Sequence, residues 1–264
     1  MDTERNLIRR AVMLSRIPIA CLLLALLVGL LPAQNEGDGK TPPVTEETIA
    51  EFQEVLDGLA KAVKEKSDVD ILYYMKEGVK KISGADAKQK TKFVALTAKG
   101  LKSKNDEVRS NAISTLGATG HPKASKFLLK EAKSKRAKNS ITYMCECIGA
   151  LGKLADPKAL KDLSKFLNNK ENRVIAAAIN AMADYRNAPL KTRKDIVDIL
   201  LKHYASVASP MTRPNPKTSD KQKFEALADS FESTLKILTK KTDLKGFDKW
   251  DRWYRKEGKK AKTW

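Results

Sequence analysis

The feature that most constrains the fold of this chain is an internal repeat. Residues 116–124 (LGATGHPKA) align without gaps with residues 151–159 (LGKLADPKA), at an offset of 35 residues. In each copy the proline stands where a second helix would begin, a position at which its missing N–H is not needed. Looser copies precede and follow these two. Because a pair of helices cannot bury its apolar face alone, successive pairs must stack against one another.

The spacing of apolar residues predicts helices from Thr45 onward. Thr45 can cap a first helix whose opening turn carries two glutamates, and the following apolar side chains recur at intervals of three and four residues. We find no convincing run of period-two alternation. The predicted class is all-α, an α-α superhelix of the armadillo-like kind with about five helix pairs over residues 45–256. In the first predicted helix, the apolar side chains that form one stripe are Ile49, Phe52, Leu56, Leu59 and Val63.

The best-defined unit, residues 106–124 (DEVRSNAISTLGATGHPKA), resembles the HEAT-repeat family. The family pattern has a Val-Arg pair early in the first helix, a Leu-Gly pair later in it, and a proline that opens the second helix. The resemblance covers roughly residues 68–240. It implies a right-handed α-solenoid whose second helices line a concave surface, and a role in protein binding.

The C-terminal part is similar to the closing segment of exported bacterial HEAT-repeat proteins, which often end in a Leu-Thr pair and a Trp-x-x-Trp tail. Here Leu238-Thr239 is followed by Phe247, Trp250, Trp253 and Tyr254. Three of these aromatic residues share one helix face. We expect them to cover the open end of the last helix pair.

The N-terminus has the layout of a secretory signal peptide. Four arginines precede an apolar run that begins at Ile17, and Ala33 offers a cleavage site. We therefore predict a signal peptide over residues 1–33, a flexible leader over 34–44, and export to the periplasm or the cell exterior. The alternative is an uncleaved membrane anchor formed by residues 17–35.

Two further segments interrupt the repeat. Residues 206–222 contain Pro210, Pro214 and Pro216, which predict an insertion loop without helix. Residues 257–264 form a basic tail that we expect to fray.

The net charge of +19 is unevenly distributed. Residues 34–84 carry a net charge of −4, and residues 85–140 carry +10. Lysines recur on the predicted second helices of two successive units, so they would form a positive patch that attracts anionic partners. The other interpretation is a solvated helix face that keeps the chain soluble. The predicted partner-binding residues are Lys123, Lys126, Lys130, Lys158, Lys161 and Lys165. The first of these two helices is expected to bury Ala124, Phe127 and Leu128.

The sequence offers little material for catalysis or metal binding. It has 2 His and 3 Cys, and we recognise no catalytic motif, no phosphate-binding loop and no metal-ligand spacing. Cys145 and Cys147 are two residues apart in one helix, so they point in different directions and cannot form a disulfide with each other. Because Cys147 matches the small residues Ala112 and Ala178 of the neighbouring units, both are expected to be small buried thiols.

We therefore expect no enzyme activity, no cofactor, no metal and no small-molecule substrate. The predicted function is an exported scaffold that binds a protein partner through a lysine-rich groove, and charge favours an acidic partner. The alternative is a binder of an anionic polymer, either nucleic acid or an acidic envelope polysaccharide. The sequence does not give the oligomeric state.

Overall fold

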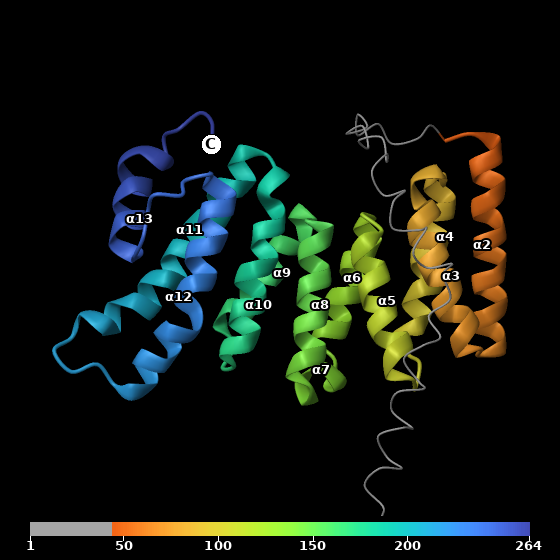
Figure 1. Ribbon diagram of the computed structural model, residues 1–264, viewed down its shortest axis with the longest axis horizontal. Coiled ribbons are helices and arrows are strands. Elements are labelled where there is room, and N and C mark those ends of the chain that lie inside the picture. Colours follow the sequence, from red (N-terminus) through yellow and green to blue (C-terminus); the bar gives the residue numbers. More distant parts are fainter. Residues whose placement is uncertain (1–43) are drawn as a thin grey trace, which may run out of the picture. The chain divides into compact units, whose positions relative to one another are not determined.

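A computed structural model describes residues 44–264, and the secondary structure of this part of the chain consists of helices, without strands. The prediction of an all-α fold is confirmed for these residues. The helices follow one another in chain order (Figure 1). Their bounds are α2 Glu46–Glu65, α3 Asp68–Lys81, α4 Ala87–Gly100, α5 Asp106–Ala118, α6 Pro122–Ala132, α7 Lys135–Asn139, α8 Ile141–Leu154, α9 Leu160–Lys165, α10 Asn172–Ala183, α11 Leu190–Ala208, α12 Thr218–Thr239 and α13 Phe247–Trp253.

Local sequence signals set several helix starts. The Thr45 side chain accepts a hydrogen bond from the backbone N–H of Thr48, whose own hydroxyl bonds back to the cap, so α2 begins with a reciprocal capping box. Asp86 and Gln89 form the same arrangement at α4. Pro122 opens α6, as the repeat predicts.

The helices pack in two rows. The first helices of successive pairs contact one another in order, α3 with α5, α5 with α8, α8 with α10 and α10 with α12. In the second row α2 packs on α4, α4 packs on α6, and α11 packs on α13. One contiguous apolar core lies between the rows. Ala112, Cys147 and Ala178, which occupy equivalent repeat positions, are all fully buried there.

The second helix of the central pair is less regular than predicted. A 3₁₀ turn at Pro157–Ala159 precedes α9, which is only six residues long, and another 3₁₀ turn at Phe166–Asn168 follows it. Residues 157–168 therefore form one continuous helical segment whose winding changes from 3₁₀ to α and back.

The predicted loop over residues 206–222 is wrong at both ends. Helix α11 continues to Ala208, a 3₁₀ turn covers Ser209–Thr212, and α12 begins at Thr218. Pro210 fits because it lies in the first turn of that short helix, where a backbone N–H has no intrahelical partner. Only residues 213–217 lie outside helices.

The expectation that the basic tail, residues 257–264, frays is also wrong. The Trp264 indole donates a hydrogen bond to the Gly258 carbonyl (3.1 Å), and its ring lies 6.0 Å from the Trp253 ring. The Lys194 ammonium donates to the carbonyl of Ala261 (2.6 Å). The tail therefore folds back on α11 and α13.

The predicted signal peptide, most of the leader and the alternative anchor over residues 17–35 lie outside the described residues. Between residues 44 and 264, no helix combines the length and the apolar character that a bilayer span requires.

Candidate functional site

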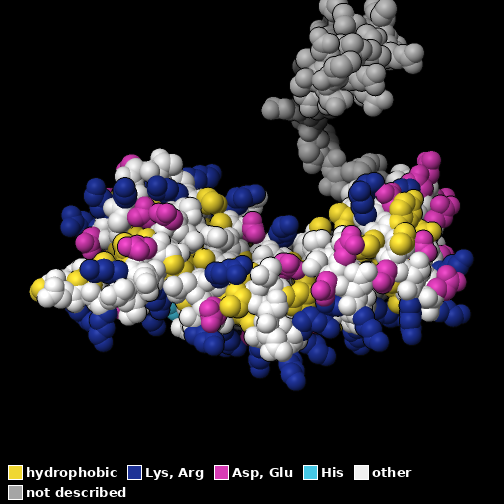
Figure 2. Space-filling model, turned by 60° about the horizontal axis from the view of Figure 1, so that its bottom comes forward, with side chains coloured by type: hydrophobic (Ala, Val, Ile, Leu, Met, Phe, Trp, Pro, Cys, Tyr) yellow, Lys and Arg dark blue, Asp and Glu magenta, His cyan; other side chains and the backbone are white. Residues whose placement is uncertain are grey.

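The structure exposes all six predicted lysines. Lys123, Lys126 and Lys130 lie on α6. Lys158 lies in the 3₁₀ turn before α9, and Lys161 and Lys165 lie on α9 itself. Figure 2 shows Lys and Arg side chains along the whole lower rim of the described part.

A carboxylate lies between the two groups of lysines. The Asp162 carboxylate accepts hydrogen bonds from Lys133, just past the end of α6, and from Lys165 on its own helix, both at 2.9 Å. These two bonds lower the pKa of Asp162 to about 2. Lys165 is thus already paired. The other five predicted lysines have no ion pair within residues 44–264.

Phe127 does not behave as predicted. Ala124 and Leu128 are fully buried, but 37% of Phe127 is exposed. Its ring faces the space between α4 and α6 and lines a pocket of about 220 Å³ together with Ala95, Ala98 and Leu101. Lys99, Lys102 and Lys130 also line this pocket, which we call the α4–α6 pocket.

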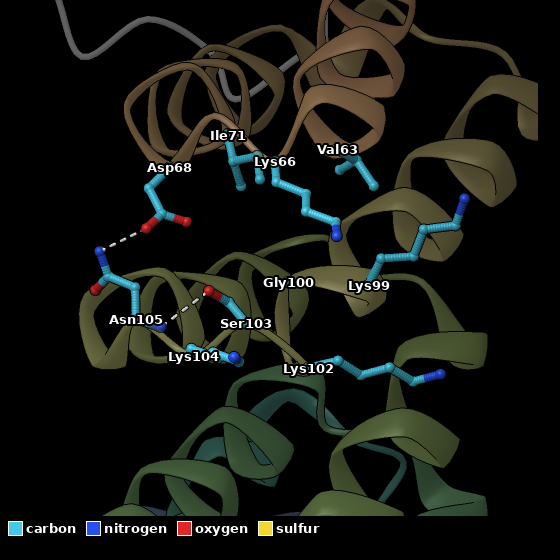
Figure 3. Close-up of a pocket in the computed structure, with 10 residues that line it drawn as sticks. All are labelled: Val63, Lys66, Asp68, Ile71, Lys99, Gly100, Lys102, Ser103, Lys104 and Asn105. Carbon is cyan, nitrogen blue, oxygen red and sulfur yellow. Dashed lines mark hydrogen bonds between the residues drawn. The ribbon is translucent and has the colours of Figure 1, made fainter.

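A second pocket of about 500 Å³ lies where the α2–α3 turn meets the α4–α5 turn (Figure 3). Its apolar lining comes from Val63, Ile71 and Gly100. We call it the turn pocket. Four lysines from the two turns and the end of α4 also line it: Lys66, Lys99, Lys102 and Lys104.

Several hydrogen bonds fix the α4–α5 turn. Asn105 caps α5, accepting from the N–H of Glu107 at 2.9 Å, and its amide nitrogen donates to Asp68 at 3.0 Å. The Arg109 guanidinium is buried and donates to the Ser103 carbonyl at 2.7 Å. Hydrogen bonds therefore hold the turn that carries Lys102 and Lys104 both to α3 and to α5, the helix that follows it.

Helical spacing in the sequence predicts neither the turn pocket nor the exposure of Phe127. A signal for the turn lysines exists, because residues 64–68 (KEKSD) match residues 102–106 (KSKND) in their lysines and in the cap before each aspartate. In both turns a lysine directly precedes the capping residue, Ser67 or Asn105. The meeting of the two turns cannot be read from this spacing.

The remaining candidate residues have structural surroundings. Cys147 is fully buried, and burial raises the pKa of its thiol to about 12. Cys145 is only partly buried, which differs from the expectation, and its partial burial raises the pKa of its thiol. Both cysteines are free. His121 caps α6 by accepting from the N–H of Lys123 at 3.2 Å, while its other ring nitrogen lies 3.2 Å from the Thr91 hydroxyl. Within the described residues no group of three or more His, Cys, Asp or Glu side chains is arranged to hold a metal ion.

Comparison with known proteins adds no family to this description. No protein-family model matches the chain, and a search of curated proteins found no match.

Proposed function

We propose that the chain is an exported, non-catalytic scaffold of HEAT-like helix pairs, an α-solenoid that binds a protein partner through its lysine-rich surface. The observation that carries this proposal is the row of exposed lysines on α6 and the α9 segment, five of which lack a carboxylate partner among the described residues. Unpaired cations on a rigid surface attract acidic partners and speed their association.

Two further observations support the helix-pair architecture of the proposal. The two rows of helices stack in chain order, as expected for repeat pairs that bury their apolar faces against their neighbours. Pro122 and Pro157 open the second helices of their pairs, as in the HEAT pattern. Export rests on the sequence of residues 1–33 alone.

The test is capture of a partner by two matched variants. In the first, Lys123, Lys126, Lys158 and Lys161 are replaced by serine. In the control, four exposed lysines nearer the C-terminus are replaced instead: Lys217, Lys221, Lys223 and Lys249. Both variants lose the same charge, and circular dichroism checks that both fold.

We expect envelope proteins that are cross-linked to the wild-type chain to be lost from the first variant and kept by the control. Equal capture by all three proteins would contradict the proposed surface.

The alternative is a binder of an anionic polymer, which the exposed lysines and the net charge of +19 also favour. Such binding releases counterions, so it weakens steeply as the salt concentration rises. A gel-shift assay with nucleic acid and with an acidic polysaccharide at two salt concentrations tests it. No shift at low salt would exclude this alternative.

A further inference from the structure

Two pockets adjoin at the C-terminal end of α4. Lys99 and Lys102 line both the turn pocket and the α4–α6 pocket, so the two hollows flank one pair of lysines. Each hollow has an apolar lining, with Val63 and Ile71 in the first and Phe127 and Leu101 in the second. We call these two neighbouring pockets together the α4 groove.

The α4 groove carries a strong excess of positive charge. Five lysines line it, against two acidic residues, and none of the five has an ion pair within the part of the chain that the structure describes. Figure 3 shows the Lys66 side chain extending from the α2–α3 turn into the space above Gly100. The five lysines are Lys66, Lys99, Lys102, Lys104 and Lys130.

The two acidic residues already have partners of their own. Asp68 accepts from the side-chain amide of Asn105 at 3.0 Å. Glu131 accepts from the Arg136 guanidinium at 3.1 Å and from the Tyr143 hydroxyl at 3.0 Å. These contacts occupy the carboxylates, while the lysine ammonium groups remain open to a ligand.

We infer that the α4 groove binds an acidic peptide segment of a partner protein that also carries apolar side chains; this rests on the proposed function and names the chemistry of its partner. Acidic side chains would pair with the lysines, and an apolar side chain would cover Phe127. A polyanion such as an acidic polysaccharide matches the lysines but leaves the apolar lining exposed to water. The combination of charge and apolar surface therefore favours a peptide.

The binding test uses a short fluorescein-labelled peptide in which two phenylalanines are flanked by aspartates and glutamates. A second peptide has serine in place of both phenylalanines, and heparin serves as the polysaccharide competitor. Fluorescence anisotropy measures the binding of each peptide to the full chain. We expect the phenylalanine peptide to bind more tightly than the serine peptide.

Three variants locate the binding. Replacing Lys99 and Lys102 by serine should weaken the binding of the phenylalanine peptide roughly tenfold, since two partly exposed charge pairs between the peptide and the groove are lost. The Lys217→Ser/Lys221→Ser variant loses the same charge far from the groove in sequence and should bind as the wild type does. Phe127→Ser should remove the preference for the phenylalanine peptide and leave the serine peptide unaffected.

Three results would overturn the inference. One is equal binding of the two peptides. Another is peptide binding that is unchanged in the Lys99/Lys102 and Phe127 variants. The third is heparin that binds more tightly than the phenylalanine peptide and depends on the same lysines, which would make the groove a polyanion site.

Failure of the proposed function looks different from failure of this inference. The proposed function fails when partner capture does not depend on the lysines of α6 and α9. The inference about the groove fails on the peptide measurements alone, whatever the chain captures.

Discussion

Gly117 and Gly152 lie where the first helices of successive pairs approach each other closely. A Cβ atom added at Gly152 would lie 2.7 Å from the backbone Cα of Ala181 in α10. At Gly117 it would lie 3.0 Å from the Cα and the carbonyl oxygen of Ala150 in α8. Both glycines belong to the Leu-Gly pair of the repeat, so this element of the sequence pattern marks a close approach between helix backbones.

Replacing Gly152 by alanine should therefore destabilise the chain by about 1–3 kcal/mol, because α8 and α10 must move apart to admit the methyl group. Gly149 lies on the same helix and has nothing within 4 Å of an added Cβ. Gly149→Ala should be neutral or stabilise by up to about 1 kcal/mol through helix propensity. Urea unfolding of both variants checks this pair, and equal effects would contradict the close approach.

Asp162 makes a pH-dependent contribution to stability. Its pKa in the folded chain, about 2, lies below the value of about 3.9 typical of an unfolded aspartate. The stabilisation is therefore fully present above about pH 4 and is lost as the pH falls toward 2. The pairs with Lys133 and Lys165 are partly exposed, so their effect is small, about 0.2–1 kcal/mol.

The Asp162→Asn variant should accordingly be less stable than the wild type at pH 6 by this small amount, and the difference should shrink between pH 4 and pH 2. The measurement is urea unfolding at several pH values. Asp243 is exposed and makes no ion pair among the described residues, so Asp243→Asn serves as the control. A wild-type advantage over Asp162→Asn that persists unchanged at pH 2 would refute the assignment.

Single residues show what the sequence could predict and what it could not. Thr45 caps α2 as predicted, and Phe52, Leu56 and Leu59 of the predicted stripe are fully buried. These outcomes follow from local chemistry and helical spacing. Phe127 was placed in the core by the same spacing, yet its burial depends on how far α4 lies from α6, which no spacing along one helix can give.

At the scale of elements, aromatic contacts attach α13 to the long helices before it. Phe247 meets Tyr204 of α11 edge to face at 5.6 Å, and Tyr204 stacks on Phe231 of α12 at 4.9 Å. Trp250 is fully buried. The predicted aromatic stripe thus packs against the last long helices, as expected from its spacing.

Trp250→Ala should destabilise the chain by about 3–5 kcal/mol, because it empties a buried site under a helix of only seven residues. Lys249 precedes it and is exposed, so Lys249→Ala should change the free energy of unfolding by no more than about 0.5 kcal/mol. Thermal unfolding followed by circular dichroism compares the two. A small loss for Trp250→Ala would show that α13 contributes little to the fold.

Two elements are wound differently from the prediction, and both contain 3₁₀ turns. The sequence of the central pair predicts one second helix, but the structure divides it into a short α-helix between two 3₁₀ turns. Prolines predicted a long loop after residue 205, but Pro210 fits into a 3₁₀ turn that extends α11. In both places the backbone takes 3₁₀ winding next to an α-helix, and apolar spacing or the position of a proline does not distinguish the two windings.

At the scale of the whole described part, most contacts link a helix to its neighbours in the two rows. Stability in such an arrangement is close to a sum of local terms, and the ends have fewer neighbours than the middle. We therefore expect backbone amides in α5, α8 and α10 to exchange with deuterium more slowly than those in α2 and α13. Mass spectrometry of the exchanging chain tests this, and uniform protection would indicate a single cooperative unit instead.

The α4 groove belongs to this largest scale. Its lysines come from two turns and two helices that lie up to 64 residues apart in the sequence. The repeat predicts that such turns gather at one edge of the stack, but the pocket also requires the Asn105–Asp68 hydrogen bond and the spacing of α4 from α6. Tertiary geometry therefore decides the candidate site, while local sequence decides most of the helices.

The clustering of Trp250, Trp253 and Trp264 at the C-terminal end also determines which part of the chain tryptophan fluorescence reports on. They are its only tryptophans, and the rings of Trp250 and Trp264 both lie within about 6 Å of the Trp253 ring. Intrinsic tryptophan emission therefore reports the state of the C-terminal end. Unfolding that starts at α2 leaves this emission unchanged. Emission and circular dichroism curves that fail to coincide would reveal at which end the chain begins to open.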